Sequence, residues 1–256
     1  MRQIANPILS IITINYNNAS GLVKTMQSVI GQSWQDFEHI VVDGGSTDKS
    51  KDVILQYADR LTHWVSEPDQ GIYHAMNKGI KIASGAYLLF LNSGDFLREP
   101  TVVQEAISQL DNYFDIIYTD LEIVADTGNY IKNYPAILSF KYFLSDTLPH
   151  PGSFIKRELF TKYGGYDESL RICADWKFFI EAICKHNVSY KHLDMVLACF
   201  LLNGISSSRQ GADIIFKEQK ECLSSSFPTF MPDYTEFDRW NKQRIVKWLK
   251  KIHLLK

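Results

Sequence analysis

The fold is decided by a short apolar run near the start of the chain, Ile8-Leu9-Ser10-Ile11-Ile12-Thr13-Ile14. This run is rich in β-branched residues and almost continuously apolar, which is typical of a strand buried on both faces of a sheet. Polar residues 15–18 end it. From Ser20, a residue type that caps helices, to about Ile30, apolar residues recur with helical spacing. We therefore expect a buried strand followed by an amphipathic helix.

The same alternation of strand and helix continues to residue 91. The pattern predicts strands over 38–42, 63–65 and 87–91, and helices from about 48 to 61 and over 72–83. Each predicted strand ends in a polar loop. This is the pattern of a doubly wound α/β sheet, in which ligands bind at the carboxyl ends of the strands.

The second half of the chain is less regular. Strands are predicted over 116–118, 131–134, 152–155, 189–193 and 195–202, and helices over 158–163 and 174–185. We expect one large domain over 1–223, made of the regularly alternating half (1–100) and the less regular half (101–223). Ser, Pro and Thr cluster over 224–234, so residues 224–256 are expected to form a C-terminal extension.

Composition excludes several classes of protein. The chain has 256 residues, 45% of them hydrophobic, which is enough to bury a sizeable core. Its formal net charge of -2 argues against nucleic acid as a partner. The four cysteines form no C-x-x-C pair and fit reduced thiols. Because neither a signal-peptide pattern nor a membrane-spanning run is present, we expect a cytoplasmic protein.

Two of the strand-end loops carry acidic residues among glycines. Asp43-Gly44-Gly45-Ser46-Thr47-Asp48 places a short carboxylate where it can accept the N–H of a nucleobase, and its glycines let a ligand approach the backbone. Leu91-Asn92-Ser93-Gly94-Asp95 places a carboxylate where it can hold a divalent cation, which would neutralise a diphosphate. Either loop taken alone could equally be an ordinary turn.

Taken together, the motifs of the first 100 residues resemble those of the family-2 glycosyltransferases, in the branch that builds bacterial surface polysaccharides. The matching stretches are 10–17, 41–48, 66–73, 75–79 and 91–95, in the order and spacing of the family. The resemblance implies the GT-A fold, an α/β architecture in which helices flank a Rossmann-like, mostly parallel sheet. It also implies that the domain over 1–223 is catalytic, with residues 1–100 binding a nucleotide-sugar donor and residues 101–223 binding the acceptor. The C-terminal extension would add a helical appendage.

The resemblance also implies roles for individual residues in binding a nucleotide-sugar donor. Asp43 would read the base, commonly uracil, and Asp95 would bind Mg²⁺ or Mn²⁺. The other donor-binding candidates are Thr13, Asn15, Tyr16, Asp69, Asn77, Lys78, Asn92 and Ser93.

Two departures from the family pattern affect this site. Asn92 and Gly94 stand where relatives carry acids, so we expect the metal to arrive largely with the donor. His74 also replaces an acid, and we interpret it as a bystander.

The second half must supply the catalytic base, because an inverting transfer needs a carboxylate to take the acceptor's hydroxyl proton. Asp175 matches the family's catalytic aspartate, although Ala174 replaces the glutamate before it. An Asp at this position could also cap the helix that follows, and both roles can hold together.

Two further positions are weaker candidates. His150, in a proline turn, could lie near the acceptor or the metal, or could be structural. Residues 203–207, which include Ser206, resemble the family's flexible loop over the donor phosphates.

The C-terminal segment 237–256 is basic and amphipathic. Its apolar residues follow helical spacing, and its charged residues are Arg239, Lys242, Arg244, Lys247, Lys250, Lys251 and Lys256 against the single acid Asp238. Such a helix suits an anionic membrane surface at the inner face of the cell membrane, where lipid-linked acceptors lie. It could equally dock on the catalytic domain or on a second copy of the chain, as in a homodimer.

These patterns predict an inverting transferase that moves a sugar from a nucleoside-diphosphate donor to a glycan or lipid-linked acceptor in polysaccharide biosynthesis. The missing carboxylates leave a nucleotide-sugar-binding protein with weak or no transfer activity as an alternative. A dinucleotide oxidoreductase is disfavoured because no G-x-G-x-x-G follows the first strand. A nucleotidyltransferase is disfavoured because no glycine-rich, basic loop follows it either.

Overall fold

One large sheet organises the molecule. The computed structural model describes residues 7–110, 113–202, 209–236 and 239, and these residues form a nine-stranded sheet. Its strands run in the order β3-β2-β1-β4-β8-β6-β9-β5, and β7 pairs with β6 at the side. The strands are β1 (Leu9–Asn15), β2 (Glu38–Asp43), β3 (His63–Ser66), β4 (Tyr87–Phe90), β5 (Phe96–Leu97), β6 (Ile116–Val124), β7 (Tyr130–Lys132), β8 (Ser153–Lys156) and β9 (Tyr190–Leu201).

The two halves of this sheet differ in strand direction. Strands β1 to β4 run parallel to one another, as the alternating pattern predicted. From β8 onward the sheet is mixed, because β8 is antiparallel to β4 and β6, whereas β9 is parallel to β6. The α/β class is therefore confirmed, with fewer parallel pairings than expected.

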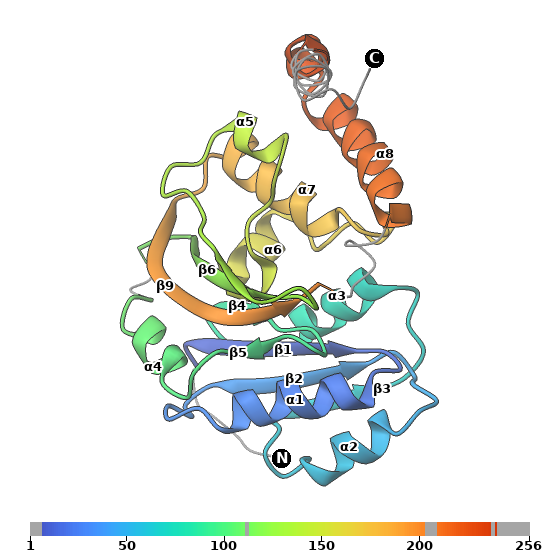
Figure 1. Cartoon of the computed structure of the whole chain (residues 1–256), viewed down its shortest axis with the longest axis vertical. Coiled ribbons are helices and arrows are strands. Elements are labelled where there is room, and N and C mark those ends of the chain that lie inside the picture. Colours follow the sequence, from blue (N-terminus) through green and yellow to red (C-terminus); the bar gives the residue numbers. More distant parts are fainter. Residues whose placement is uncertain (1–6, 111–112, 203–208, 237–238, 240–256) are drawn as a thin grey trace.

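Helices cover both faces of the sheet (Figure 1). In β2, Val41 packs against α1 and α2, whereas Ile40 and Val42 share the core on the α3 side. In Figure 1, α5, α6 and α7 lie above the sheet and α1 and α2 lie below it. The helices are α1 (Ala19–Ile30), α2 (Ser50–Gln56), α3 (Ile72–Ile82), α4 (Val102–Ile107), α5 (Phe140–Phe143), α6 (Arg157–Tyr163), α7 (Ala174–Ile180) and α8 (Arg209–Ser226), with short turns η1 (His150–Gly152), η2 (Glu181–Lys185) and η4 (Pro228–Phe230).

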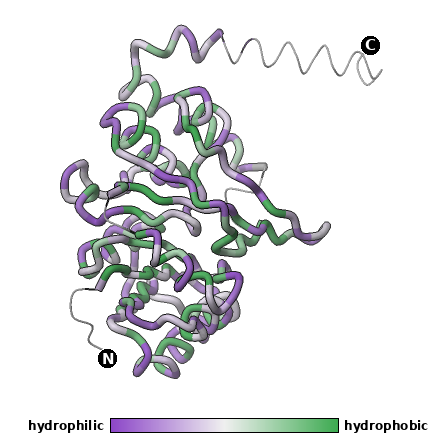
Figure 2. Tube along the Cα trace, turned by 90° about the vertical axis from the view of Figure 1, so that its left-hand side faces the viewer, coloured by the Kyte–Doolittle hydropathy of each residue, from purple (hydrophilic) through white to green (hydrophobic). Residues whose placement is uncertain are grey.

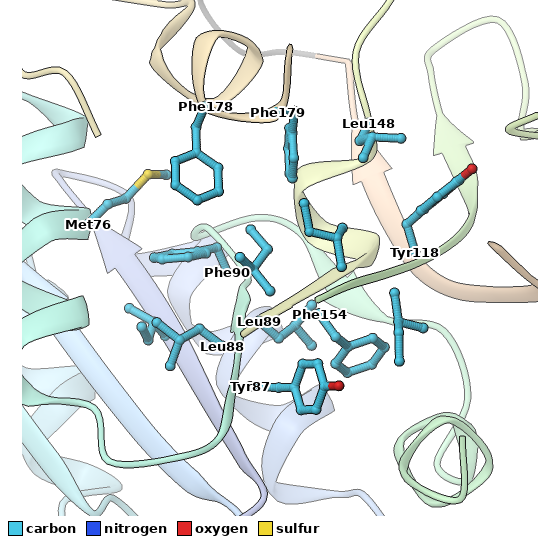
Figure 3. Close-up of a cluster of buried hydrophobic side chains, with 14 of the residues drawn as sticks. Met76, Tyr87, Leu88, Leu89, Phe90, Tyr118, Leu148, Phe154, Phe178 and Phe179 are labelled. Carbon is cyan, nitrogen blue, oxygen red and sulfur yellow. The ribbon is translucent and has the colours of Figure 1, made fainter. Parts of the chain in front are cut away.

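A continuous hydrophobic core joins the two halves. Figure 3 shows side chains from α3, β4, β6, β8 and α7 converging, among them Met76, Phe90, Tyr118, Phe154 and Phe179. The hydropathy trace likewise places hydrophobic stretches through the middle of the molecule (Figure 2). Burial of this kind stabilises the fold by roughly 25 cal/mol per Å² of apolar surface. The core extends to Phe227, and the expected division at residue 223 falls within α8.

Some predicted boundaries were wrong for local reasons. Helix α1 begins at Ala19, because the side chain of Asn18, and not that of Ser20, accepts the N–H of Gly21. The two strands expected over 189–202 are one strand, β9, whose pairing with β6 shifts register near Asp120. Within the described residues, no helix combines the length and the apolar character that crossing a membrane requires.

Candidate active site

The register of the parallel strands brings polar side chains together at their carboxyl ends. Asn15 of β1 lies opposite Asp43 of β2, and Asp43 lies opposite Ser66 of β3. The fully buried Asp43 carboxylate accepts from Asn15 Nδ2 (2.6 Å), Ser66 Oγ (2.7 Å) and both the N–H and the hydroxyl of Ser46 (3.0 and 2.5 Å). Burial alone would raise the pKa of Asp43, but these hydrogen bonds outweigh it and lower the pKa.

Asn15 also ties this cluster to the loop after β4. Ser93 Oγ donates to Asn15 Oδ1 (2.7 Å), and Asn18 Nδ2 donates to the carbonyl of Ser93 (3.0 Å). The structure thus brings together three predicted donor-binding residues, Asn15, Asp43 and Ser93, as one hydrogen-bonded group. Their side chains organise the strand ends.

A different surface is left for a ligand beside Gly44. A Cβ atom at Gly44 would lie 3.1 Å from Asp69 Oδ2 and 3.2 Å from the ring of Tyr16, so both side chains approach this glycine closely. Tyr16 is 67% exposed, which leaves most of its ring available for stacking. Asp69 Oδ2 is buried and has no hydrogen-bond partner in the described part of the chain.

The other oxygen of Asp69 is held by α3. Asp69 Oδ1 lies 2.5 Å from Lys78 Nζ and 3.1 Å from His74 Nδ1, and Lys78 also pairs with Glu67 at 2.8 Å. His74, expected to be a bystander, therefore helps to fix this carboxylate. Its other oxygen, Oδ2, lies beside Gly44 and is buried without a hydrogen-bond partner among the described residues, so it retains its capacity to accept an N–H or O–H.

Asp95 is a buried acid that forms no ion pair with the described residues. Among these residues its carboxylate accepts one weak hydrogen bond, from the N–H of Leu201 (3.3 Å), and burial raises its pKa to about 7. The nearby Asn92 Oδ1 is also buried and has no partner among the described residues. Thr25 holds the loop by donating to the Asp95 carbonyl (2.6 Å) and accepting from the N–H of Gly94 (3.0 Å).

These two oxygens suit a divalent cation but do not complete its coordination. Mg²⁺ and Mn²⁺ prefer carboxylate and carbonyl oxygens, which Asp95 and Asn92 supply. Among the described residues, no three acidic, histidine or cysteine side chains form a metal-binding group. The residues therefore fit a cation whose remaining ligands come from a diphosphate.

Asp175 lies in the first turn of α7, where a side chain from α3 reaches it. Tyr73, on α3, places its hydroxyl 2.9 Å from Asp175 Oδ1 and within hydrogen-bonding distance of the Ile172 carbonyl. Burial and the charge of Asp175 raise the pKa of Tyr73 well above its usual value, so its hydroxyl remains a donor. Tyr73 was not predicted as a site residue, because its role depends on the contact between α3 and α7.

His150 is packed among aromatic rings. Its ring stacks on Phe90 at 4.9 Å, and its Nε2 lies 2.9 Å from the hydroxyl of Tyr166. Burial lowers the pKa of His150, and the charge of Asp175 opposes that shift in part. The structure thus places His150 within the core beside the base candidate. Ser206 lies outside the described residues.

Two predicted donor-binding side chains do not face this site. Asn77 Nδ2 donates to the Tyr166 carbonyl (2.9 Å) and to Glu168 (2.7 Å), and its Oδ1 accepts from the N–H of Tyr166 (2.8 Å). Its amide is therefore used to hold the loop before α7. Thr13 is fully buried within β1, with its hydroxyl 3.2 Å from His39 Nε2.

Comparison with known proteins identifies the class to which this fold and site belong. The family described as Glycosyl transferase family 2 matches residues 10–169, so the chain belongs to this family of glycosyltransferases. An uncharacterized glycosyltransferase of Mycobacterium tuberculosis is 35% identical over 214 residues, covering 80% of this chain and 79% of the relative. A PGL/p-HBAD biosynthesis glycosyltransferase of Mycobacterium bovis is 30% identical over 202 residues, covering 77% of this chain and 78% of the relative.

Solved structures show the same fold at lower identity. S. aureus TarS in complex with UDP-GlcNAc has a TM-score of 0.65 and 19% identity, over 81% of this chain and 64% of that chain. The mannosyltransferase PcManGT from Pyrobaculum calidifontis, in complex with GDP-Man and Mn²⁺, has a TM-score of 0.62 and 17% identity, over 89% of this chain and 65% of that one. The expected GT-A fold is thereby confirmed.

Replacing the buried acid Asp95 with asparagine should stabilise the ligand-free protein at alkaline pH. Because the pKa of Asp95 rises from 3.8 to about 7 on folding, the folded state loses stability as the pH rises through this range. We expect Asp95→Asn to raise the free energy of unfolding by about 2–4 kcal/mol at pH 8 and by less than about 1 kcal/mol at pH 4. Urea denaturation with EDTA present measures both values.

The exposed Asp59 provides a matched control, and Asp59→Asn should leave the free energy of unfolding unchanged at both pH values. A gain for Asp95→Asn that is equal at pH 4 and pH 8 would contradict the assigned pKa.

Proposed function

We propose that this glycosyltransferase moves a sugar from a nucleoside-diphosphate donor, with uracil as the base, to a glycan or lipid-linked acceptor with inversion. One observation carries the proposal. Adjacent residues in the first turn of α3 contact both parts of the site, since His74 lies against Asp69 and Tyr73 lies against Asp175. A single turn of α3 therefore holds both Asp69, the candidate nucleotide contact, and Asp175, the candidate base.

The nucleobase would lie on Tyr16, over the backbone of Gly44. Uracil carries an N–H between two carbonyls, and Asp69 Oδ2 offers an acceptor that no described residue occupies. Asp43 was expected to read the base, but its carboxylate already accepts four hydrogen bonds. We therefore assign Asp43 to shaping the pocket and Asp69 to contacting the base. UDP-GlcNAc bound to TarS is consistent with a uridine donor.

Asp95 and Asn92 would hold Mg²⁺ or Mn²⁺ together with the donor diphosphate. A divalent cation neutralises the charge that develops on the departing nucleoside diphosphate. The raised pKa of Asp95 supports this assignment, because a nearby cation would compensate its buried charge. The Mn²⁺ bound with GDP-Man in PcManGT is in keeping with it.

Asp175 would act as the general base. Its carboxylate would take the proton of the acceptor hydroxyl while that oxygen bonds to the anomeric carbon and the diphosphate leaves with the electron pair of the broken bond. The Tyr73 hydroxyl shares its one proton between Oδ1 and the Ile172 carbonyl. This contact orients the Asp175 carboxylate and leaves Oδ2 for the acceptor. Attack on the face opposite the leaving group gives inversion.

The acceptor would be presented at a membrane surface. The relative from Mycobacterium bovis is named for PGL/p-HBAD biosynthesis, which supports a glycan or lipid-linked acceptor. The basic, amphipathic segment 237–256 lies outside the described residues except for Arg239, and we assign to it peripheral binding at the cytoplasmic face. Docking on a second copy of the chain is the competing role for this segment.

A donor-binding protein with weak or no transfer activity is the second candidate. It is favoured by the absence of a carboxylate at Asn92, Gly94 and Ala174, where the family pattern has acids. Donor binding without turnover on a panel of acceptors would support it.

The affinity for nucleotide should depend on a divalent cation through Asp95. The preference for one nucleobase should depend on Asp69. In calorimetric titrations with UDP, GDP, CDP and ADP, we expect UDP to bind most tightly and Mn²⁺ to tighten it at least tenfold. Asp95→Ala should abolish the effect of Mn²⁺, because it removes the charged ligand. Asp69→Asn should reduce the preference for UDP, and the exposed-site variant Asp59→Ala should change neither. Full Mn²⁺ dependence in Asp95→Ala would contradict the metal assignment.

Replacing Asp175, the candidate general base, with asparagine should slow sugar transfer strongly but preserve donor binding. Asp175→Asn keeps the acceptor oxygen that Tyr73 contacts but cannot take a proton, so we expect the rate of sugar transfer to fall by roughly 10²–10⁴-fold. UDP affinity should stay within about twofold. As a matched control, Asp167→Asn breaks the ion pair between Asp167 and Lys177, which lies on the same helix as Asp175. This variant should retain most of the activity. A native rate in Asp175→Asn would show that another group is the base.

Deleting residues 237–256 should weaken binding to anionic vesicles. Co-sedimentation with vesicles containing phosphatidylglycerol should fall at least tenfold, because each Lys or Arg near an anionic surface contributes about 1 kcal/mol. Neutral phosphatidylcholine vesicles serve as the control and should bind neither form. Equal binding of both forms to anionic vesicles would exclude a membrane role, and a change of dimer to monomer would assign the segment to self-association.

A further inference from the structure

Glu218 is a buried acid on α8 whose partners all lie in one short loop. It is 8% exposed, and its Oε1 accepts from the N–H of Arg171 at 2.6 Å. Its Oε2 accepts from the N–H groups of Ile172 (3.0 Å) and Cys173 (2.9 Å). Three consecutive backbone amides thus surround one carboxylate, which is the arrangement of an anion-binding nest.

The position calls for an explanation because apolar residues would dock α8 at lower cost. A buried carboxylate is unfavourable unless it is well hydrogen-bonded. Cys222 and Leu223 on the same helix already pack into the core. The acid therefore does something that apolar packing cannot, namely orient specific backbone N–H groups.

The loop that Glu218 holds leads directly into the first turn of α7, which carries the candidate base Asp175. The peptide between Ile172 and Cys173 is gripped at both ends, since Tyr73 contacts its carbonyl oxygen and Glu218 accepts its N–H. Helix α7 then begins, with Lys177 donating to the carbonyl of Cys173 at 2.8 Å. Asp175 lies in this first turn, so rotation of the peptide would move its carboxylate.

We propose that Glu218 is a positioning residue that holds Asp175 in place through the backbone of residues 171–173. The inference rests on the proposed function, in which Asp175 is the base. It extends the catalytic machinery to α8, which lies beyond residues 10–169, where the chain matches the family. Tyr73 from α3 and Glu218 from α8 act on the same peptide from opposite sides.

The test uses Glu218→Gln in the full-length chain. Glutamine keeps the shape, but its NH₂ group faces backbone N–H donors and loses at least one of the three bonds. We expect a 10- to 100-fold fall in kcat, with affinity for UDP within about twofold. Hydrogen exchange of the amides of residues 171–173 should accelerate at least tenfold, whereas that of amides beyond Lys177 should not change.

A second variant separates positioning from simple docking of α8. Ser226, at the far end of the helix, hydrogen-bonds to Glu181 and does not contact the loop. Ser226→Ala should leave kcat within twofold, even if Tm falls. A kcat for Glu218→Gln within twofold of native, or an equal loss of kcat in Ser226→Ala, would overturn the proposal.

The double variant Asp175→Asn/Glu218→Gln separates this proposal from the function on which it rests. If Glu218 acts through Asp175, the double variant should be no slower than Asp175→Asn alone. Additive losses would overturn the positioning role and leave Asp175 as the base. A native rate in Asp175→Asn would overturn both, whereas a slow Asp175→Asn with a native Glu218→Gln would overturn only the positioning role.

Discussion

The side-chain amide of Asn77 makes three hydrogen bonds to the loop before α7, and the geometry of the site depends on them. A Cβ atom at Gly165 would lie 2.5 Å from Asn77 Oδ1, so the loop can approach this closely only with glycine there. Tyr73, one turn earlier on the same face of α3, reaches Asp175. Because residues four apart lie on one face of a helix, a single face of α3 holds both Asp175 and the loop before α7.

A second face of α3 holds the loop after β3 in the same way. His74 and Lys78, again four residues apart, both contact Asp69. The helix is seated on the sheet at Gly79, where a Cβ atom would lie 2.5 Å from Ile12. The distance between the two parts of the site is thus set by a rigid helix on a buried strand. This rigidity suits a reaction that requires donor and acceptor to meet in one orientation.

Much of this could be predicted from sequence, because local patterns carry the information. The alternation over residues 8–91 predicted β1 to β4, and the polar residues after them predicted where the loops would gather. The mixed half of the sheet could not be predicted in this way, since pairings such as β6 with β9 join segments about 70 residues apart. The same limit applied to Tyr73 and Glu218, whose partners are distant in sequence and include backbone groups.

The sequence by itself determined the family, the parallel half of the sheet and the acids at its edge, because these follow from short motifs and hydrophobic periodicity. Only the tertiary structure decided which acids keep an oxygen without a partner. Asp43 is saturated by neighbours that strand register places beside it. In the described part of the chain, Asp69 keeps one unpartnered oxygen and Asp95 is buried without an ion pair. The physical reason is that the reactivity of a carboxylate depends on its hydrogen bonds and burial, and both are set by residues far along the chain.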